Sequence, residues 1–185
     1  MAVSVEKRLL TVEEYNEMGR VGILGPSDKV ELIHGEIIKM SPIGSKHANT
    51  VNKLNEVLRN FISKKVIISI QNPVVLDEIN EPQPDISILM YREDFYGKIL
   101  PTSKDIYALI EVSGTSIAYD KEVKTNLYAK AGIPEYWIID IENDQLEIYS
   151  NAEKDRYKDS QIFMKEDELV SYLINDKVKV EDLLI

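Results

Sequence analysis

Two prolines separated by a single residue, Pro82 and Pro84, most constrain how this chain can fold. Each ring fixes φ, removes a backbone donor and disfavours helix at the preceding residue, so the segment NEPQP cannot be helical. The chain therefore runs extended into the apolar segment DISILMY, which predicts a strand beginning at Asp85. A second run, DIYALIEVS, predicts another strand with Glu111 near its C-terminal end. Each of these two predicted strands thus carries a carboxylate near one end.

Apolar residues at helical spacing predict three helices. The first begins at a capping box formed by Thr11 and Glu14, the second has Ser45 as a candidate cap, and the third is ended by Gly132 and Pro134. The predicted helices cover residues 12–19, 47–64 and 120–131.

Short runs of β-branched and aromatic residues predict the remaining strands. VELI and EIIKM form a hairpin around the turn His34-Gly35, and EYWIID with QLEIYS form a second hairpin. VIISI and PVVL form either a strand pair or one long bent strand. The tail contains two strand-like pieces, RYKDSQIFM and ELVSYLI, and its apolar end, VEDLLI, is expected to dock on the body.

The chain contains no internal repeat, low-complexity tract or Gly/Ser linker, so one domain over 1–185 is expected. Strands interspersed with a few helices indicate an α/β or α+β fold: a mixed sheet flanked by helices.

Composition excludes several kinds of site. The absence of Cys excludes disulfides, thiolate nucleophiles and Cys-ligated zinc, and the two His residues, His34 and His47, exclude a His-rich metal site. No apolar run approaches the roughly 20 residues of a membrane helix, and the beginning does not resemble a signal peptide, so a cytoplasmic protein is expected. The net charge of −10 argues against general coating of phosphates but leaves a metal-assisted nucleic-acid site open.

Carboxylates are therefore the candidate ligands. If their strands are neighbours, Asp85 and Glu111 can converge on one divalent cation, and the backbone carbonyl of Val112 could add a further ligand. Hard oxygen ligands of this kind suit Mg²⁺ or Mn²⁺. Glu36, which begins a strand, and Glu31 are weaker candidates for an additional acidic group.

A lysine near the cation would position water and neutralise developing charge. Ser113 stands where a simple E-x-K motif would have its lysine, so the following helix must supply one. At about 100° per residue, Lys124 lies about 60° from the centre of the predicted buried stripe and Lys121 about 120°. Lys124 is therefore the better candidate, with Tyr128 on the same side of the helix.

The combined order of PQPD, EVSGTS and the stretch from DKEVK to EYWIID resembles the PD-(D/E)XK nuclease superfamily. More closely, it resembles the bacterial family of stand-alone domains described as putative restriction endonucleases. The resemblance implies a restriction-endonuclease-like core with Asp85 and Glu111 as metal ligands and Lys124 as the lysine moved from the strand to the helix. Ser113 is the departure from the superfamily pattern, although it is typical of this family.

The leading hypothesis is a Mg²⁺- or Mn²⁺-dependent DNA endonuclease that leaves 5′-phosphate and 3′-hydroxyl ends, as the resemblance implies. Candidate contacts to its substrate are Glu36, His47, Gln71 and Tyr128. The alternatives are a catalytically silent module that binds nucleic acid or a protein partner, and a metal-free carboxylate-pair hydrolase such as a glycosidase. A homodimer would let two sites address two strands, and a separate partner could supply sequence recognition.

Overall fold

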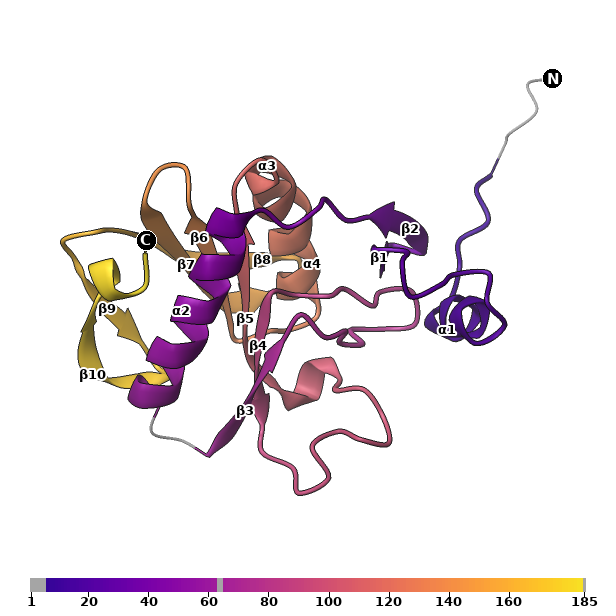
Figure 1. Cartoon of the computed structure of the whole chain (residues 1–185), viewed down its shortest axis with the longest axis horizontal. Helices are drawn as coiled ribbons and strands as arrows, with labels where there is room; N and C mark the ends of the chain where they lie inside the picture. Colours follow the sequence, from indigo (N-terminus) through magenta and orange to yellow (C-terminus); the bar gives the residue numbers. More distant parts are fainter. Residues whose placement is uncertain (1–5, 63–64, 185) are drawn as a thin grey trace.

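The computed structural model describes residues 6–62 and 65–184. Its centre is a six-stranded sheet with the order β3-β4-β5-β6-β7-β8 (Figure 1). β5 and β6 are parallel, and the other neighbouring strands of this sheet are antiparallel. The strands are β3 (Val66–Ile70), β4 (Ile86–Met90), β5 (Ile106–Ser113), β6 (Glu135–Asp140), β7 (Gln145–Glu153) and β8 (Arg156–Met164). This mixed sheet, flanked by helices, confirms the predicted fold class.

Helices cover both faces of the sheet. On one face, Leu54 of α2 (Ser45–Phe61) belongs to the same buried apolar cluster as Ile110 of β5. On the other, Leu127 of α4 (Thr125–Lys130) shares a cluster with Leu109. Successive side chains of a strand point to opposite faces, so the continuous apolar run of β5 serves both layers. In the described ranges, no helix is long and apolar enough to cross a membrane.

The parallel pair β5–β6 requires a crossover, which the helical stretch between these strands provides. It consists of α3 (Ile117–Tyr119), the π-helical segment η2 (Asp120–Lys124) and α4. The sequence predicts a helix over 120–131, whereas the helical stretch begins earlier and includes a π turn. In that turn the Thr125 N–H donates to the Asp120 carbonyl, an i to i+5 bond.

The N-terminal part lies beside the sheet (Figure 1). It contains α1 (Val12–Arg20) and a hairpin of β1 (Val30–Ile33) and β2 (Glu36–Lys39). The predicted capping box is present, because Thr11 Oγ1 accepts from the Glu14 N–H and the Glu14 carboxylate accepts from the Thr11 N–H. A β-bridge between Leu32 and Glu81 ties the hairpin to the segment that leads into β4.

The prediction that PVVL is a strand of a sheet is wrong. The segment is extended, and its backbone N–H groups pair with carbonyls of loop residues: Val74 with Pro82, Val75 with Pro101 and Leu76 with Asn80. Val74 and Leu76 are buried in the core, so apolar residues are needed here although no neighbouring strand pairs with the segment.

The beginning of α2 also differs from the prediction. The N-cap is Gly44, which has no side chain to cap the helix, and Ser45 is the first helical residue. The helix ends at Phe61, and residues 63 and 64 of the predicted helix lie outside the described residues.

The tail docks on the body, as predicted. It forms β9 (Glu168–Ser171), β10 (Ile174–Lys179) and the short 3₁₀ helix η3 (Val180–Asp182). Val180, Leu183 and Leu184 are buried in the apolar cluster that contains α2. Ile185, the last residue of VEDLLI, lies outside the described residues.

Candidate active site

Asp85 and Glu111 lie opposite each other at the same end of neighbouring strands. The ladder between β4 and β5 pairs Ile86 with Ile110, so Asp85, one residue before β4, continues it opposite Glu111. Because side chains alternate along a strand, Glu111 points away from α2, towards the layer of α4. The Asp85 carboxylate lies at the end of β4, where it reaches both the Val112 backbone and His47 of α2. Pro84 keeps the backbone extended immediately before Asp85, and this conformation helps to place Asp85 opposite Glu111.

Donors from three segments hold the Asp85 carboxylate. Its Oδ2 accepts from the backbone N–H of Val112 at 2.9 Å and forms a 2.9 Å hydrogen bond with Nε2 of His47, in the first turn of α2. Its Oδ1 accepts from Nε2 of Gln71 at 3.2 Å. The hydrogen bond to Asp85 raises the pKa of His47 above its usual value, although burial opposes the shift. The Asp85 side chain keeps 13% of its surface exposed, so solvent reaches the site here.

The Glu111 carboxylate is buried deeper. Its Oε1 accepts from Lys124 Nζ at 2.9 Å and from the Tyr128 hydroxyl at 2.8 Å. Burial raises the pKa of Glu111 to about 8; Lys124 opposes this, and the charge of Asp85 adds to it. Among the described residues, no hydrogen-bond donor reaches Glu111 Oε2. One oxygen of this buried carboxylate is thus held in place, and the other is free of hydrogen bonds.

Lys124 lies among three carboxylates. Its Nζ is 2.9 Å from Glu111, 3.5 Å from Glu31 and 4.0 Å from Asp120. Burial would lower the pKa of Lys124, but these carboxylates together raise it, so the ammonium stays protonated. The Lys124 side chain is only 7% exposed, against 36% for Lys121, which pairs with Glu147. The helix therefore turns Lys124 inward, in the order expected from the sequence.

Ser113 has a structural partner at this site. Its hydroxyl donates to Asp120 Oδ2 at 2.6 Å, and the Ser116 hydroxyl donates to the same oxygen at 2.8 Å. Asp120 begins the π-helical segment that ends at Lys124. Ser113 thus anchors Asp120, the first residue of the π-helical segment that ends at Lys124.

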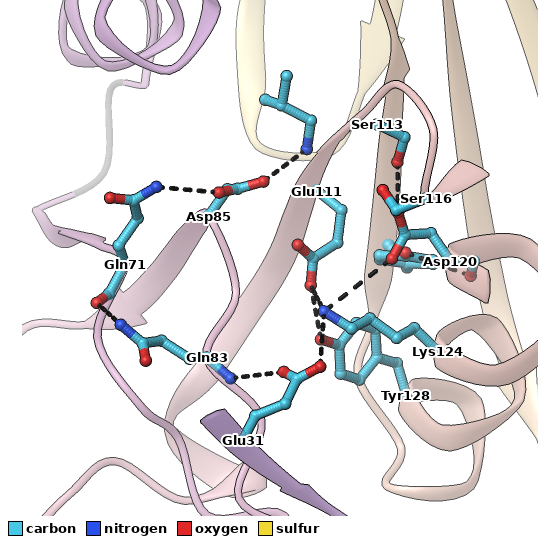
Figure 2. Close-up of polar contacts among 12 residues, drawn as sticks. Glu31, Gln71, Gln83, Asp85, Glu111, Ser113, Ser116, Asp120, Lys124 and Tyr128 are labelled. Atoms are coloured by element: carbon cyan, nitrogen blue, oxygen red, sulfur yellow. Dashed lines mark hydrogen bonds and ion pairs between the residues drawn. The ribbon is translucent and has the colours of Figure 1, made fainter. Parts of the chain in front are cut away.

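A chain of polar contacts runs from Asp85 through Gln71, Gln83, Glu31 and Lys124 to Glu111, as Figure 2 shows. Glu31, on β1, contacts Lys124 and accepts from the backbone N–H of Gln83 at 3.1 Å. The Gln83 amide donates in turn to the backbone carbonyl of Gln71, which holds Asp85. The hairpin, the Pro-Gln-Pro segment and the helix are thereby joined around the carboxylate pair.

Comparison with known proteins defines the family. A family model described as "Putative restriction endonuclease", Uma2, matches residues 12–176. The chain belongs to the Uma2 family. No curated protein sequence matches this Uma2 chain. A crystal structure of "a putative nuclease belonging to DUF820" from Anabaena variabilis ATCC 29413 is similar in fold, with a TM-score of 0.72 and 18% identity over 94% of this chain and 97% of that one.

The charge balance of the Uma2 site favours an added cation. Glu31, Glu111 and Asp120 are almost fully buried and share the ammonium group of Lys124, while Asp85 pairs with His47. Buried carboxylates are costly unless they are paired or bound to metal. Within residues 6–62 and 65–184, no three His, Cys, Asp or Glu side chains form a ready-made metal cluster. Mg²⁺ nevertheless needs only one or two carboxylates, with water or substrate oxygens filling its remaining positions.

Most of the predicted site residues gather in this Uma2 site. The structure brings together the residues Asp85, Glu111, Val112, Lys124, His47, Gln71 and Tyr128. Glu36 does not join them, because it points outward from the hairpin, pairs with Lys7 at 2.9 Å and has a 46% exposed side chain.

Two contributors are harder to find from the sequence. Glu31 is a weaker candidate there, although it carries the same signal as Glu111, an acidic residue within an apolar strand. Gln83 carries no signal of its own, because a polar residue between two prolines is typical of any exposed loop.

Proposed function

We propose that this Uma2 chain is a divalent-cation-dependent phosphodiesterase that cuts DNA. The proposal rests on one observation: two carboxylates, Asp85 and Glu111, lie opposite each other at the ends of adjoining strands, with the Lys124 ammonium 2.9 Å from Glu111. The family description, restriction endonuclease, supports DNA as the substrate.

Asp85, Glu111 and the Val112 carbonyl would hold the cation. The N–H and C=O of one residue point to the same edge of a strand, and the Val112 N–H already donates to Asp85. The carbonyl of Val112 therefore faces the edge at which Asp85 lies. Mg²⁺ or Mn²⁺ bound there would polarise the scissile phosphate and lower the pKa of a coordinated water.

Lys124 would supply positive charge next to the reacting phosphate. Its ammonium remains protonated among the carboxylates and is held by contacts to three of them. A preorganised charge of this kind stabilises the charge that develops on phosphate oxygens without reorganising during the reaction. Hydrolysis would add water across the P–O bond and leave a 5′-phosphate and a 3′-hydroxyl.

The remaining residues would hold the machinery or contact DNA. His47 and Gln71 bond to Asp85 at the solvent-facing side of the site, so they are the better candidates for contact with substrate. Tyr128 is fully buried and donates to Glu111, so we propose that it holds this carboxylate instead of touching DNA. A second copy of the chain or a separate partner would supply recognition of a DNA sequence.

Plasmid cleavage tests the proposal. Purified chain with Mg²⁺ or Mn²⁺ should nick supercoiled DNA, and Asp85→Asn and Glu111→Gln should each lower the rate about 100-fold or more. Asp94→Asn is the matched control, because this carboxylate pairs with Arg92 away from the site. Calorimetric titration with Mn²⁺ should show one site in the wild type and in Asp94→Asn, and much weaker binding in Asp85→Asn.

Other outcomes reject the proposal in different ways. Equal cleavage by the wild type and Asp85→Asn would point to a contaminant or to another site. Mn²⁺ binding without cleavage of any DNA would favour a silent binding module, and full activity in a chelator would favour a metal-free hydrolase.

A further inference from the structure

Gln71 has an unusual backbone conformation for its residue type. Its φ is +50°, in the left-handed region, where non-glycine residues are uncommon and pay a steric penalty. Asn and Asp adopt this region most readily among the other residues, whereas Gln has no such preference. Gln71 follows directly after β3 and is only partly exposed. A strained residue beside a candidate site calls for a physical reason.

The contacts of Gln71 give that reason. Its backbone N–H donates to the backbone carbonyl of Asp85 at 3.0 Å, and its side-chain Nε2 donates to Asp85 Oδ1 at 3.2 Å. The same residue therefore holds Asp85 at two points, by main chain and by carboxylate. Because β3 pairs with β4 up to Ile70 opposite Ile86, the left-handed turn comes at the first position beyond the ladder.

A third contact of Gln71 connects it to the residues around Lys124. The Gln71 carbonyl accepts from the Gln83 side-chain amide, and the Gln83 N–H donates to Glu31, which contacts Lys124 (Figure 2). Gln71 thus links the contacts that hold Asp85 to those that hold Lys124.

A left-handed residue elsewhere in the chain, Lys154, serves as a comparison. Lys154 has a φ of +60° in the turn between β7 and β8, where it is exposed and far along the sheet from β4. Its conformation is required by that turn. Lys154 therefore provides an internal comparison for a strained backbone without a carboxylate to position.

We infer that Gln71 is a positioning residue, kept in a strained conformation because it aims the Asp85 carboxylate for the cation. The inference rests on the proposed function, in which Asp85 is a ligand. It assigns to Gln71 a role that acts through Asp85 and requires no contact between its own amide and DNA. Partners that orient a ligand typically contribute 10–100-fold to metal affinity.

Three variants and two measurements test this role. Gln71→Gly relieves the backbone strain and removes the amide, Gln71→Met removes the amide and retains the bulk and the strain, and Lys154→Gly relieves strain in the comparison turn. The melting temperature in chelator measures the stability of the fold. The Mn²⁺ affinity from calorimetric titration measures how well the Asp85 carboxylate is oriented for the cation. Asp85→Asn, titrated alongside, shows whether the measured site is the proposed one.

The expected signature is a loss of affinity without a loss of fold. Gln71→Gly and Gln71→Met should bind Mn²⁺ about 10-fold or more weakly. Gln71→Gly should melt within roughly 2–4 °C of the wild type, because relief of strain offsets the lost hydrogen bond. Lys154→Gly should melt at or above the wild-type temperature and bind Mn²⁺ as the wild type does.

Two results would overturn the inference. Mn²⁺ affinity within twofold of the wild type in both Gln71 variants would show that the amide does not aim Asp85. Melting temperatures lowered in both by more than about 5 °C would show that Gln71 merely supports the fold. Failure of the proposed function has a separate signature, since wild type and Asp85→Asn would then titrate alike.

Discussion

The Lys124 ammonium contacts Glu111 at 2.9 Å in a place where neither side chain has more than 7% of its surface exposed. The two residues belong to consecutive elements, β5 and the helical crossover, and they meet because the crossover folds back over the strand. Glu31 and Asp120 share the same ammonium. A single ammonium group thus contacts three buried acidic side chains, and the effect of this arrangement should be measurable in stability, in metal binding and in their dependence on pH.

Lys124→Met should destabilise the chain strongly in chelator. Removing one partner of a buried ion pair leaves uncompensated charge and costs about 3–5 kcal/mol of unfolding free energy. Saturating Mn²⁺ should restore part of this loss, because the cation replaces the missing charge, while nuclease activity stays absent. Urea unfolding with and without Mn²⁺ measures both effects. Lys158→Met, which breaks an exposed pair with Glu153, should change the unfolding free energy by less than about 1 kcal/mol. Equal small losses in the two variants would contradict the burial argument.

Glu111 should make stability depend on pH when no divalent cation is present. Its pKa is raised to about 8 in the folded chain from the usual 4.5, so the folded state holds a proton that the unfolded state has released. The contribution is fully present below pH 4.5 and is lost as pH rises towards 8, by at most about 1.4 kcal/mol per pH unit. Above about pH 8 this contribution should level off.

Glu111→Gln should remove that part of the slope, which urea unfolding from pH 5 to pH 9 in chelator measures. Mn²⁺ affinity should show the opposite trend and rise up to about pH 8, since the ligand must lose its proton to bind. A slope unchanged by Glu111→Gln would assign the pH dependence to other groups.

Tyr128→Phe should lower the Mn²⁺ affinity of the site and leave the packing of the aromatic ring in the core intact. The variant keeps the edge-to-face contact with Tyr136, whose ring centroid is 4.8 Å away, and loses only the hydroxyl that bonds to Glu111. The loss should cost about 1–2 kcal/mol of stability and about 10-fold in Mn²⁺ affinity. Tyr96→Phe is the matched control, because that hydroxyl donates to the Met90 carbonyl outside the site. If both variants bind Mn²⁺ equally well, Tyr128 does not hold the carboxylate.

Ser113→Ala should separate a structural from a catalytic role at the position of the expected strand lysine. The variant removes a 2.6 Å hydrogen bond to the buried Asp120 and should cost about 1–2 kcal/mol. Cleavage should fall less than about 10-fold, because the crossover still delivers Lys124. Ser116→Ala, which removes the other hydroxyl bonded to the same oxygen, gives the comparison. A loss of activity as large as that of Lys124→Met would assign Ser113 a direct part in the reaction.

Much of the frame can be predicted from local sequence. The prolines at 82 and 84, the apolar runs after them and the acidic residues at their ends are sufficient to predict two strands, each with a carboxylate near one end. The helical angle also distinguishes Lys124 from Lys121, because a difference of about 60° around a helix separates an inward from an outward side chain.

The remainder depends on contacts that no local pattern encodes. PVVL has the composition of a strand, yet its hydrogen-bond partners are loop residues, so only the tertiary fold decides its state. The π turn at Asp120 depends on contacts of its carbonyl with Thr125 and Tyr136, which lie on different elements. The two contacts of Gln83, to Glu31 and to Gln71, join segments that come close to each other only after the hairpin has docked.

The division of the site between sheet and crossover has a consequence for how it opens. β4 and β5 are interior strands, each hydrogen-bonded on both sides, whereas the backbone of α4 is bonded within its own helix. Local opening of a chain begins where tertiary support is weakest, so amide exchange should be faster along the crossover than along these strands. Local opening of the crossover would then move Lys124 away from the site while β4 and β5 keep Asp85 and Glu111 in place. Loading with an ion and readiness for turnover are, on this view, separable states of one molecule.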